Sequence, residues 1–143
     1  MSDLNEIRAA SAKFYTALNR MAAGDAAPMA DAWARREDSS AQHPIGGRDQ
    51  GYDAIIASFS RVAKIAEGGD IRLVEQKIVA GSDMAVETGK EKGTLVIAGH
   101  TATIDQRVTN VYLKADGMWR MVHHHTDMSQ DMLEILKRLS EPA

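Results

Sequence analysis

The apolar positions in the first half of the chain recur at steps of three and four residues, the spacing that lines one face of a helix. The clearest stripe holds Leu4, Ile7, Phe14, Leu18 and Met21, and Gly24 follows where such a helix ends. The same reasoning applies to three further segments. We expect helices at Asp3–Ala22, at a short segment that starts at Asp25–Pro28 and buries Met29 and Trp33, at Tyr52–Ala66 with Gly68 and Gly69 as its end, and after Ser129, where Met132, Ile135, Leu136 and Leu139 form the stripe.

From Asp70 to Thr126 the helical spacing gives way to runs rich in β-branched and aromatic residues. The strongest turn signal is Ala115-Asp116-Gly117, because Asp-Gly between two such runs is typical of a hairpin. Gly93 is expected to mark a bulge or a bend inside its strand. The expected strands are Ile71–Ala80, Met84–Lys92 continued by Thr94–Ala98, Arg107–Lys114 and Met118–Thr126, with a short upstream strand and turn at Ala41–Gly47.

The hairpin formed by the last two runs carries apolar residues on both faces, so we expect both faces to be covered. Strict alternation divides its second strand into Trp119, Met121, His123 and His125 on one face and Arg120, Val122, His124 and Thr126 on the other. Three helices, a mostly antiparallel meander and a closing helix are the order of an α+β fold. The 143 residues contain no linker or repeat, so we expect a single domain over residues 1–143.

Composition and charge narrow the classes of function. Hydrophobic residues at 44% and charged residues at 26% are ordinary globular values, and a net charge of −3 offers no basic surface to nucleic acid. The absence of cysteine from the sequence excludes disulfides and thiol catalysis and agrees with a reducing compartment. The start MSDLNEIRAA is unlike a signal peptide, and no apolar run reaches membrane-spanning length. We therefore expect a cytoplasmic protein that binds neither nucleic acid nor membrane.

Two segments carry a family resemblance, HPIGGRDQGYDAI at His43–Ile56 and RVTNVYLKADGMWRMVHHHTD at Arg107–Asp127. With the order of helices and strands, they make the chain resemble the SnoaL-like branch of the nuclear-transport-factor-2-like, ketosteroid-isomerase-like superfamily. The resemblance implies a cystatin-like cone, in which a curved, mostly antiparallel sheet and N-terminal helices enclose an apolar pocket, with a C-terminal helix. It also implies a homodimer through the outer face of the sheet. Members include isomerases, cyclases, hydrolases, dehydratases and non-catalytic association modules, so the fold alone does not identify a reaction.

The resemblance also places side chains relative to the pocket. Counted from Asp116-Gly117, Asn110 and Thr126 stand where the kinase association domain of this superfamily has pocket arginines. The pocket face then holds Val108, Asn110, Tyr112, Val122, His124 and Thr126, and the opposite face holds Val111, Leu113, Trp119, Met121, His123 and His125 for a partner subunit. A β-bulge would reverse this assignment. The aspartate and tyrosine arrangement of the steroid isomerases has no recognisable counterpart in the sequence.

Two histidines are candidate catalytic proton carriers. Pro44 holds His43 extended at a strand end, where its imidazole either reaches the pocket or bonds a loop carbonyl and fixes the turn. The hairpin brings His124 beside Asn110 and Tyr112, so we expect these side chains to line one cavity and to orient a carbonyl or hydroxyl group. The remaining ligand-binding candidates are aromatic or hydroxyl-bearing residues expected at the cavity wall, namely Tyr15, Trp33, Tyr52, Phe59 and Thr126.

The triplet His123-His124-His125 raises a metal hypothesis that the spacing does not support. Only the first and third share a side of a strand, about 7 Å apart, and the sequence has no spaced ligand motif. We therefore expect neither a metal nor another cofactor. For the charged residues of the strands we expect cross-strand ion pairs that contribute little to stability, formed by Glu87, Glu91, Asp105 and Arg107.

Two classes of function remain open. The first is a small enzyme, an isomerase, cyclase or hydrolase, that uses general acid–base chemistry on a small apolar or partly polar molecule bearing oxygen. The second is a non-catalytic ligand-binding or dimeric association module. The concentration of His, Asn and Tyr along the expected cavity favours the first class, and the lack of a recognisable acid–base pair favours the second.

Overall fold

The computed structural model describes residues 2–141. N-terminal helices, a set of mostly antiparallel strands and a C-terminal helix confirm the α+β class. None of the helices in this part of the chain is long and apolar enough to cross a membrane. The elements are, in chain order, α1 (Ser2–Ala22), α2 (Met29–Ala32), β1 (Ser40–Gln42), β2 (Asp49–Gln50), α3 (Tyr52–Ile65), β3 (Ala66–Ala80), β4 (Met84–Ile97), β5 (His100–Ala115), β6 (Met118–Thr126) and α4 (Gln130–Ser140).

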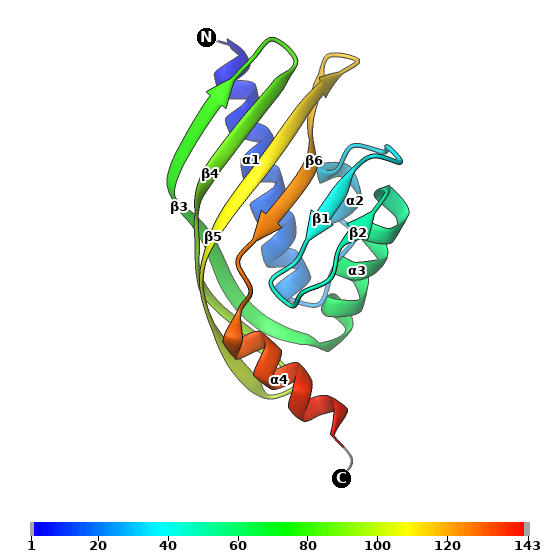
Figure 1. The fold of residues 1–143 in the computed structure, drawn as a ribbon, viewed down its shortest axis with the longest axis vertical. Helices are drawn as coiled ribbons and strands as arrows, with labels where there is room; N and C mark the ends of the chain where they lie inside the picture. The colour runs from blue at the N-terminus through cyan, green and yellow to red at the C-terminus, as the bar shows by residue number, and fades with distance from the viewer. Residues whose placement is uncertain (1, 142–143) are drawn as a thin grey trace.

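Within residues 2–141, six strands form one curved sheet in the order β2-β1-β6-β5-β4-β3. Neighbouring strands are antiparallel, except that β1 runs parallel to β6. Figure 1 shows the sheet curving around α1, with α3 beside β1 and β2 and with α4 at the end away from the β5–β6 turn. The sheet and the helices therefore form the cystatin-like cone that the family resemblance implies.

Helix α1 packs its predicted apolar stripe against the concave face of the sheet. Ile7, Phe14 and Leu18 are buried. Asn19 also fixes the helix to β3, because its side-chain amide donates to the carbonyl oxygen of Ile71 at 2.9 Å and accepts from the backbone nitrogen of Ile71 at 2.8 Å. The amide thus satisfies both backbone groups of one strand residue and sets the position of α1 along β3.

The third helix ends earlier than the sequence predicts. Helix α3 stops at Ile65, and Ala66 is already extended and paired with Ile97 of β4. Gly68 and Gly69 therefore lie inside β3, and the expectation that they end the helix is wrong. Pairing with the far end of β4 extends the strand past the two glycines, which local sequence signals do not reveal.

Gly93 marks a bend in β4 and not a bulge, because it stays paired with Ile71 on one side and Ile104 on the other. Its φ is +147°, and a Cβ atom on it would lie 1.7 Å from the carbonyl oxygen of Asp70. Only glycine allows this close approach of the two backbones. The bend curls β3 and β4 around the end of the cone (Figure 1).

The hairpin between β5 and β6 forms at Asp116 and Gly117, whose φ angles of 54° and 75° fit the two-residue turn that Asp-Gly favours. Further along the hairpin the pairing passes from Tyr112 with Met121 directly to Val111 with His123. Val122 is therefore the extra residue of a β-bulge.

The bulge corrects the expected division of β6 into two faces. Trp119 and Met121 lie on the inner face and are buried, so their expected place on the outer face is wrong. Val122 sits at the bulge and is not part of the inner face. His124 and Thr126 keep their expected inner positions, because they lie beyond the bulge and pair with inner residues of β5.

Replacing Trp119 by Ala should lower the free energy of unfolding by about 3–5 kcal/mol, because the change deletes a large aromatic side chain that is only 7% exposed. Denaturant unfolding measures this loss. Met118→Ala is the matched control, since Met118 is 47% exposed at the same turn and its loss should stay below about 0.5 kcal/mol. A Trp119→Ala loss under about 1 kcal/mol would contradict the buried position.

Candidate functional site

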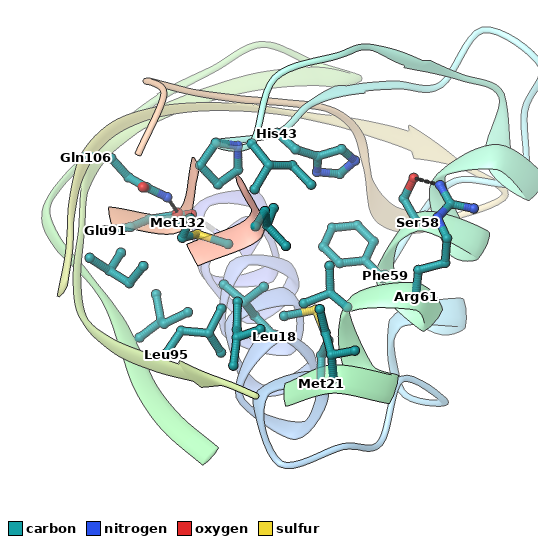
Figure 2. A pocket seen from close by; sticks show the side chains of 18 of the residues that line it. Leu18, Met21, His43, Ser58, Phe59, Arg61, Glu91, Leu95, Gln106 and Met132 are labelled. Atoms are coloured by element: carbon teal, nitrogen blue, oxygen red, sulfur yellow. Dashed lines mark hydrogen bonds between the residues drawn. The ribbon is translucent and has the colours of Figure 1, made fainter. Parts of the chain in front are cut away.

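A cavity of about 210 Å³ lies between the concave face of the sheet and helices α1, α3 and α4. Figure 2 shows Leu18 and Met21 of α1, Phe59 of α3 and Leu95 of β4 around it. Most of the lining side chains are apolar. The polar or charged side chains that reach it are His43, Ser58, Arg61, Glu91, Gln106 and His124.

Three of these polar side chains, on three neighbouring strands, form the inner end of the cavity. Glu91 of β4 lies opposite Gln106 of β5, whose Nε2 donates to Glu91 Oε1 at 2.8 Å. The Nε2 atom of His124, on β6, lies 4.0 Å from Glu91 Oε2. All three side chains are buried. Figure 2 shows Glu91 and Gln106 on the side of the cavity opposite Ser58 and Arg61.

A second layer of hydrogen bonds lies behind this inner end. The amide oxygen of Asn110 is 2.6 Å from Nδ1 of His124, and its amide nitrogen donates to the hydroxyl of Tyr15 at 3.0 Å and to Glu87 at 2.9 Å. The hydroxyl of Tyr15 in turn donates to Glu91 Oε2 at 2.9 Å. An amide oxygen only accepts, so His124 carries its proton on Nδ1 and presents an unprotonated Nε2 toward Glu91.

Burial moves both titratable groups of the inner end toward their uncharged forms. Loss of water raises the pKa of the Glu91 carboxyl group, although hydrogen bonds from Gln106 and Tyr15 act in the opposite direction. Loss of water also lowers the pKa of His124 to about 3, with a smaller contribution from His43. The 4.0 Å contact therefore pairs a carboxyl group that holds its proton more tightly than usual with a neutral imidazole, whose Nε2 is a hydrogen-bond acceptor.

The sequence reasoning missed several polar residues of this site, namely Glu87, Glu91, Gln106, Ser58 and Arg61. For Glu87 and Glu91 the expected role in cross-strand ion pairs is wrong, because both are buried on the inner face of β4, 0% and 2% exposed, and accept from uncharged side chains. Glu87 accepts hydrogen bonds from Tyr112, Asn110 and Gln76 at 2.7 to 2.9 Å. The surface ion pairs of these strands are Lys90 with Asp105 and Arg107 with Asp127.

The family model described as a SnoaL-like domain matches residues 7–129. The chain belongs to the SnoaL-like domain family. No curated protein matches the sequence of this SnoaL-like chain.

Solved structures with the same fold accompany this match. A candidate dehydratase of the NTF2-like family from Streptomyces avermitilis is 20% identical, with a TM-score of 0.78 over 89% of this chain and 96% of that one. A protein of cystatin-like fold from Caulobacter vibrioides is 19% identical, with a TM-score of 0.74 over 97% and 98%. A candidate calcium/calmodulin-dependent protein kinase type II association domain from Thiobacillus denitrificans is 26% identical, with a TM-score of 0.66 over 86% and 94%. These similarities show that the SnoaL-like chain has the same fold as NTF2-like proteins.

The structure brings some of the predicted site residues of this SnoaL-like domain to the cavity and leaves others behind its wall. His43, His124 and Phe59 line the cavity. Asn110, Tyr112 and Tyr15 do not line the cavity. They form the hydrogen-bonded layer behind His124 and Glu91. The three other predicted ligand-binding residues also do not line this cavity, namely Trp33, Tyr52 and Thr126.

The mouth of the cavity carries a separate polar cluster. His43 Nε2 is 2.7 Å from Asp49 Oδ2, which also accepts from the hydroxyl of Ser58, and Arg61 donates to Ser58 Oγ at 2.8 Å. The ring of His43 meets the ring of Phe59 edge-on, with centroids 5.2 Å apart. The side chain of His43 lines the cavity and is still 12% exposed to water, whereas His124 is buried.

His123 and His125 lie on the outer face of the sheet, opposite the cavity. Nδ1 of His123 is 2.7 Å from the hydroxyl of Ser40, and the two imidazole rings are 6.1 Å apart. Between residues 2 and 141, no group of three or more His, Cys, Asp or Glu side chains is placed to hold a metal ion.

Replacing Glu91 by Gln should change how stability depends on pH. Folding raises the pKa of Glu91, so between its unfolded and folded pKa values the folded protein binds more protons, and stability falls as the pH rises through this window. Glu91→Gln removes that loss. At higher pH the variant should gain about 1.4 kcal/mol relative to the wild type for each unit of pKa shift.

Denaturant unfolding of both proteins at a series of pH values from about 4 to 8 measures the effect of Glu91. Glu6→Gln on the exposed face of α1 is the control, because that carboxyl group is open to water. A stability difference between Glu91→Gln and wild type that stays constant over the whole pH range would contradict the shifted pKa.

Proposed function

We propose that this SnoaL-like protein is an enzyme that moves a proton on a small, uncharged, mostly apolar molecule bearing a carbonyl or hydroxyl group. One observation carries the proposal. An acid, Glu91, and a base, His124, stand 4.0 Å apart at the inner end of an apolar cavity. Perturbed titratable groups that face a cavity are typical of catalytic sites.

In the proposed reaction, Nε2 of His124 takes a proton from a carbon beside the carbonyl group of the ligand. Glu91 gives its proton to the carbonyl oxygen, so the C–H electrons form the C=C bond of an enol and the carbonyl π electrons form the O–H bond. The imidazolium and the carboxylate that result attract each other at short range. This attraction offsets the weak basicity of a buried imidazole.

The fate of the enol decides the type of reaction. In a ligand whose enol is conjugated with a second C=C bond, His124 can return the proton to the far carbon of that bond. The C=C bond then shifts beside the carbonyl group, the O–H electrons form the C=O bond again, and the hydroxyl proton returns to Glu91, which gives isomerisation. Transfer of the proton from His124 to a hydroxyl group on the β carbon breaks the C–O bond and releases water. The enol electrons form a C=C bond between the α and β carbons, the carbonyl forms again and its proton returns to Glu91, which gives dehydration. Both routes restore the neutral Glu91–His124 pair, as a catalytic cycle requires.

The cavity also favours one class of ligand. Its wall is mostly apolar, so a charged ligand would lose its hydration without a matching counterion at the inner end. Oε1 of Gln106 is buried and has no hydrogen-bond partner among residues 2–141, and it is free to accept from a ligand hydroxyl group. We propose that His43, at the half-open mouth, exchanges protons between the cavity and water.

Proton exchange tests the proposal without a known substrate. A panel of small uncharged ketones and β-hydroxy ketones is incubated with the protein in D₂O, and NMR measures deuterium entering the carbon beside the carbonyl group. His124→Gln and Glu91→Gln should each lower the catalysed exchange at least about 100-fold, as loss of a general acid or base does. Glu6→Gln is the matched control. Exchange that persists unchanged in both site variants, or is absent from the whole panel, would contradict the proposal.

A second candidate function is that of a dimeric association module, and the outer face of the sheet favours it. Val79, Val86 and Val111 face outward in one row across β3, β4 and β5, and Met84 and Leu113 form the next row. Val79, Val86 and Met84 are exposed. An apolar face of this kind is typical of a subunit interface. We propose a homodimer through this face, built from single-domain chains in the cytoplasm.

Light scattering at micromolar concentration should give the mass of a dimer. Leu113→Glu should convert it to a monomer, because the change places a charge in the second apolar row of the proposed interface. Ala9→Glu on the exposed face of α1 is the matched control and should leave the dimer intact. A wild-type protein with the mass of a monomer would rule out the homodimer.

A further inference from the structure

A buried amide connects the carboxylate of Glu87 to His124. Asn110 is fully buried, and every hydrogen-bonding group of its side chain has a partner. The two amide hydrogens go to Glu87 Oε1 and to the hydroxyl of Tyr15, and the amide oxygen faces Nδ1 of His124 at 2.6 Å. Asn110 therefore leaves nothing free for a ligand and acts through the groups that it holds.

Glu87 and Tyr15 together decide which way this amide points, because the Tyr15 hydroxyl gives its own hydrogen to Glu91 and accepts from Asn110. A carboxylate only accepts hydrogen bonds, so the atom of Asn110 that lies 2.9 Å from it must be the nitrogen. If the amide turned over, its oxygen would face the carboxylate and its nitrogen would face Nδ1 of His124. Two buried acceptors would then meet without a hydrogen between them, a mismatch that proteins rarely tolerate.

The orientation of Asn110 in turn decides which nitrogen of His124 carries the proton. The amide oxygen can only accept, so Nδ1 must be the protonated nitrogen and Nε2 must keep its lone pair. The lone pair faces Glu91 Oε2, 4.0 Å away, at the cavity lining. With the amide reversed, Nε2 would carry the proton and His124 could not accept one from a ligand.

We propose that Glu87 is a positioning residue that acts through Asn110 to fix His124 in the Nδ1–H tautomer and so keeps Nε2 available as the base. The catalytic consequence rests on the proposed function. The tautomer itself is a property of the folded protein without ligand, so it is measured independently of any reaction.

NMR spectra that correlate the ring nitrogens of histidine with its ring protons distinguish the two tautomers, and His124→Gln assigns the signals. The wild type should show His124 in the Nδ1–H form. In Glu87→Gln, the new amide can donate as well as accept, so residue 87 no longer prevents Asn110 from turning over, and the Tyr15 hydroxyl follows by turning its hydrogen from Glu91 to the Asn110 oxygen. The ratio of the Nε2–H form to the Nδ1–H form should rise about tenfold or more, the change that corresponds to one buried hydrogen bond.

Two further variants separate positioning from a general effect on the fold. Tyr112→Phe removes another donor to the same oxygen of Glu87 but leaves the bond from Asn110, so the tautomer should not change. Asn110→Asp replaces the amide by a group that still accepts from Nδ1, so the Nδ1–H form should persist. This variant tests the contact between residue 110 and His124. If Glu87→Gln fails to fold, the wild-type tautomer still tests the inference, because an Nε2–H form would contradict it.

Any one of three results would overturn the inference. These are an Nε2–H form in the wild type, an unchanged tautomer in folded Glu87→Gln, and a shift to Nε2–H in Asn110→Asp. Deuterium exchange by Glu87→Gln separates it from the proposed function and should fall with the fraction of the Nδ1–H form. If the tautomers behave as stated but the wild type exchanges no ligand, the proposed reaction is wrong and the positioning role stands. If the wild type catalyses exchange but the tautomer of His124 does not change in Glu87→Gln, the proposed reaction stands and the positioning role is wrong.

Discussion

The inner face of the sheet holds two carboxyl groups away from water, and the rest of the structure depends on satisfying them. A buried carboxyl group without partners costs several kcal/mol, more than most single interactions contribute. The donors come from elements far apart in the chain. Tyr15 comes from α1, Gln76 from β3, and Asn110, Tyr112 and Gln106 from β5. The position of α1 and the register of β5 on β4 are therefore both set in part by the need to bring hydrogen-bond donors to Glu87 and Glu91.

Local signals in the sequence predict most of the elements, because those signals act over a few residues. The stripe of α1, the Asp-Gly turn and the cap of α4 by Ser129 all appear where expected. The faces of β6 could not be predicted in this way. The segment after α2 runs beside β6, and the backbone nitrogen of Ala34 donates to the carbonyl oxygen of Met121 at 2.8 Å. The bulge at Val122 lies next to this contact, which joins residues remote in sequence.

The candidate site was partly predictable. The resemblance to the SnoaL-like family placed His124 and Asn110 on the inner face and predicted a cone with a cavity, but it supplied no acid partner. In the first part of β4 the apolar residues Met84 and Val86 face outward, while the charged residues Glu87 and Glu91 face inward. The rule that apolar residues face the core and charged residues face water would therefore assign these residues to the wrong faces. The carboxyl groups become recognisable only through the pairing of Glu87 with Asn110 and of Glu91 with Gln106.

The same alternation places the two candidate functions on opposite sides of the same strands. On β4, Val86 faces outward beside Glu87, which faces inward, and on β5 the outward Val111 adjoins the inward Asn110. A partner subunit on the outer face would therefore hold the strands that carry the buried network without touching the cavity. The pKa of Glu91 stays raised and that of His124 stays lowered only while water is kept out, so rigid strands would serve the proposed chemistry. Association and catalysis are thus compatible in this fold, and the outer face would support the inner one.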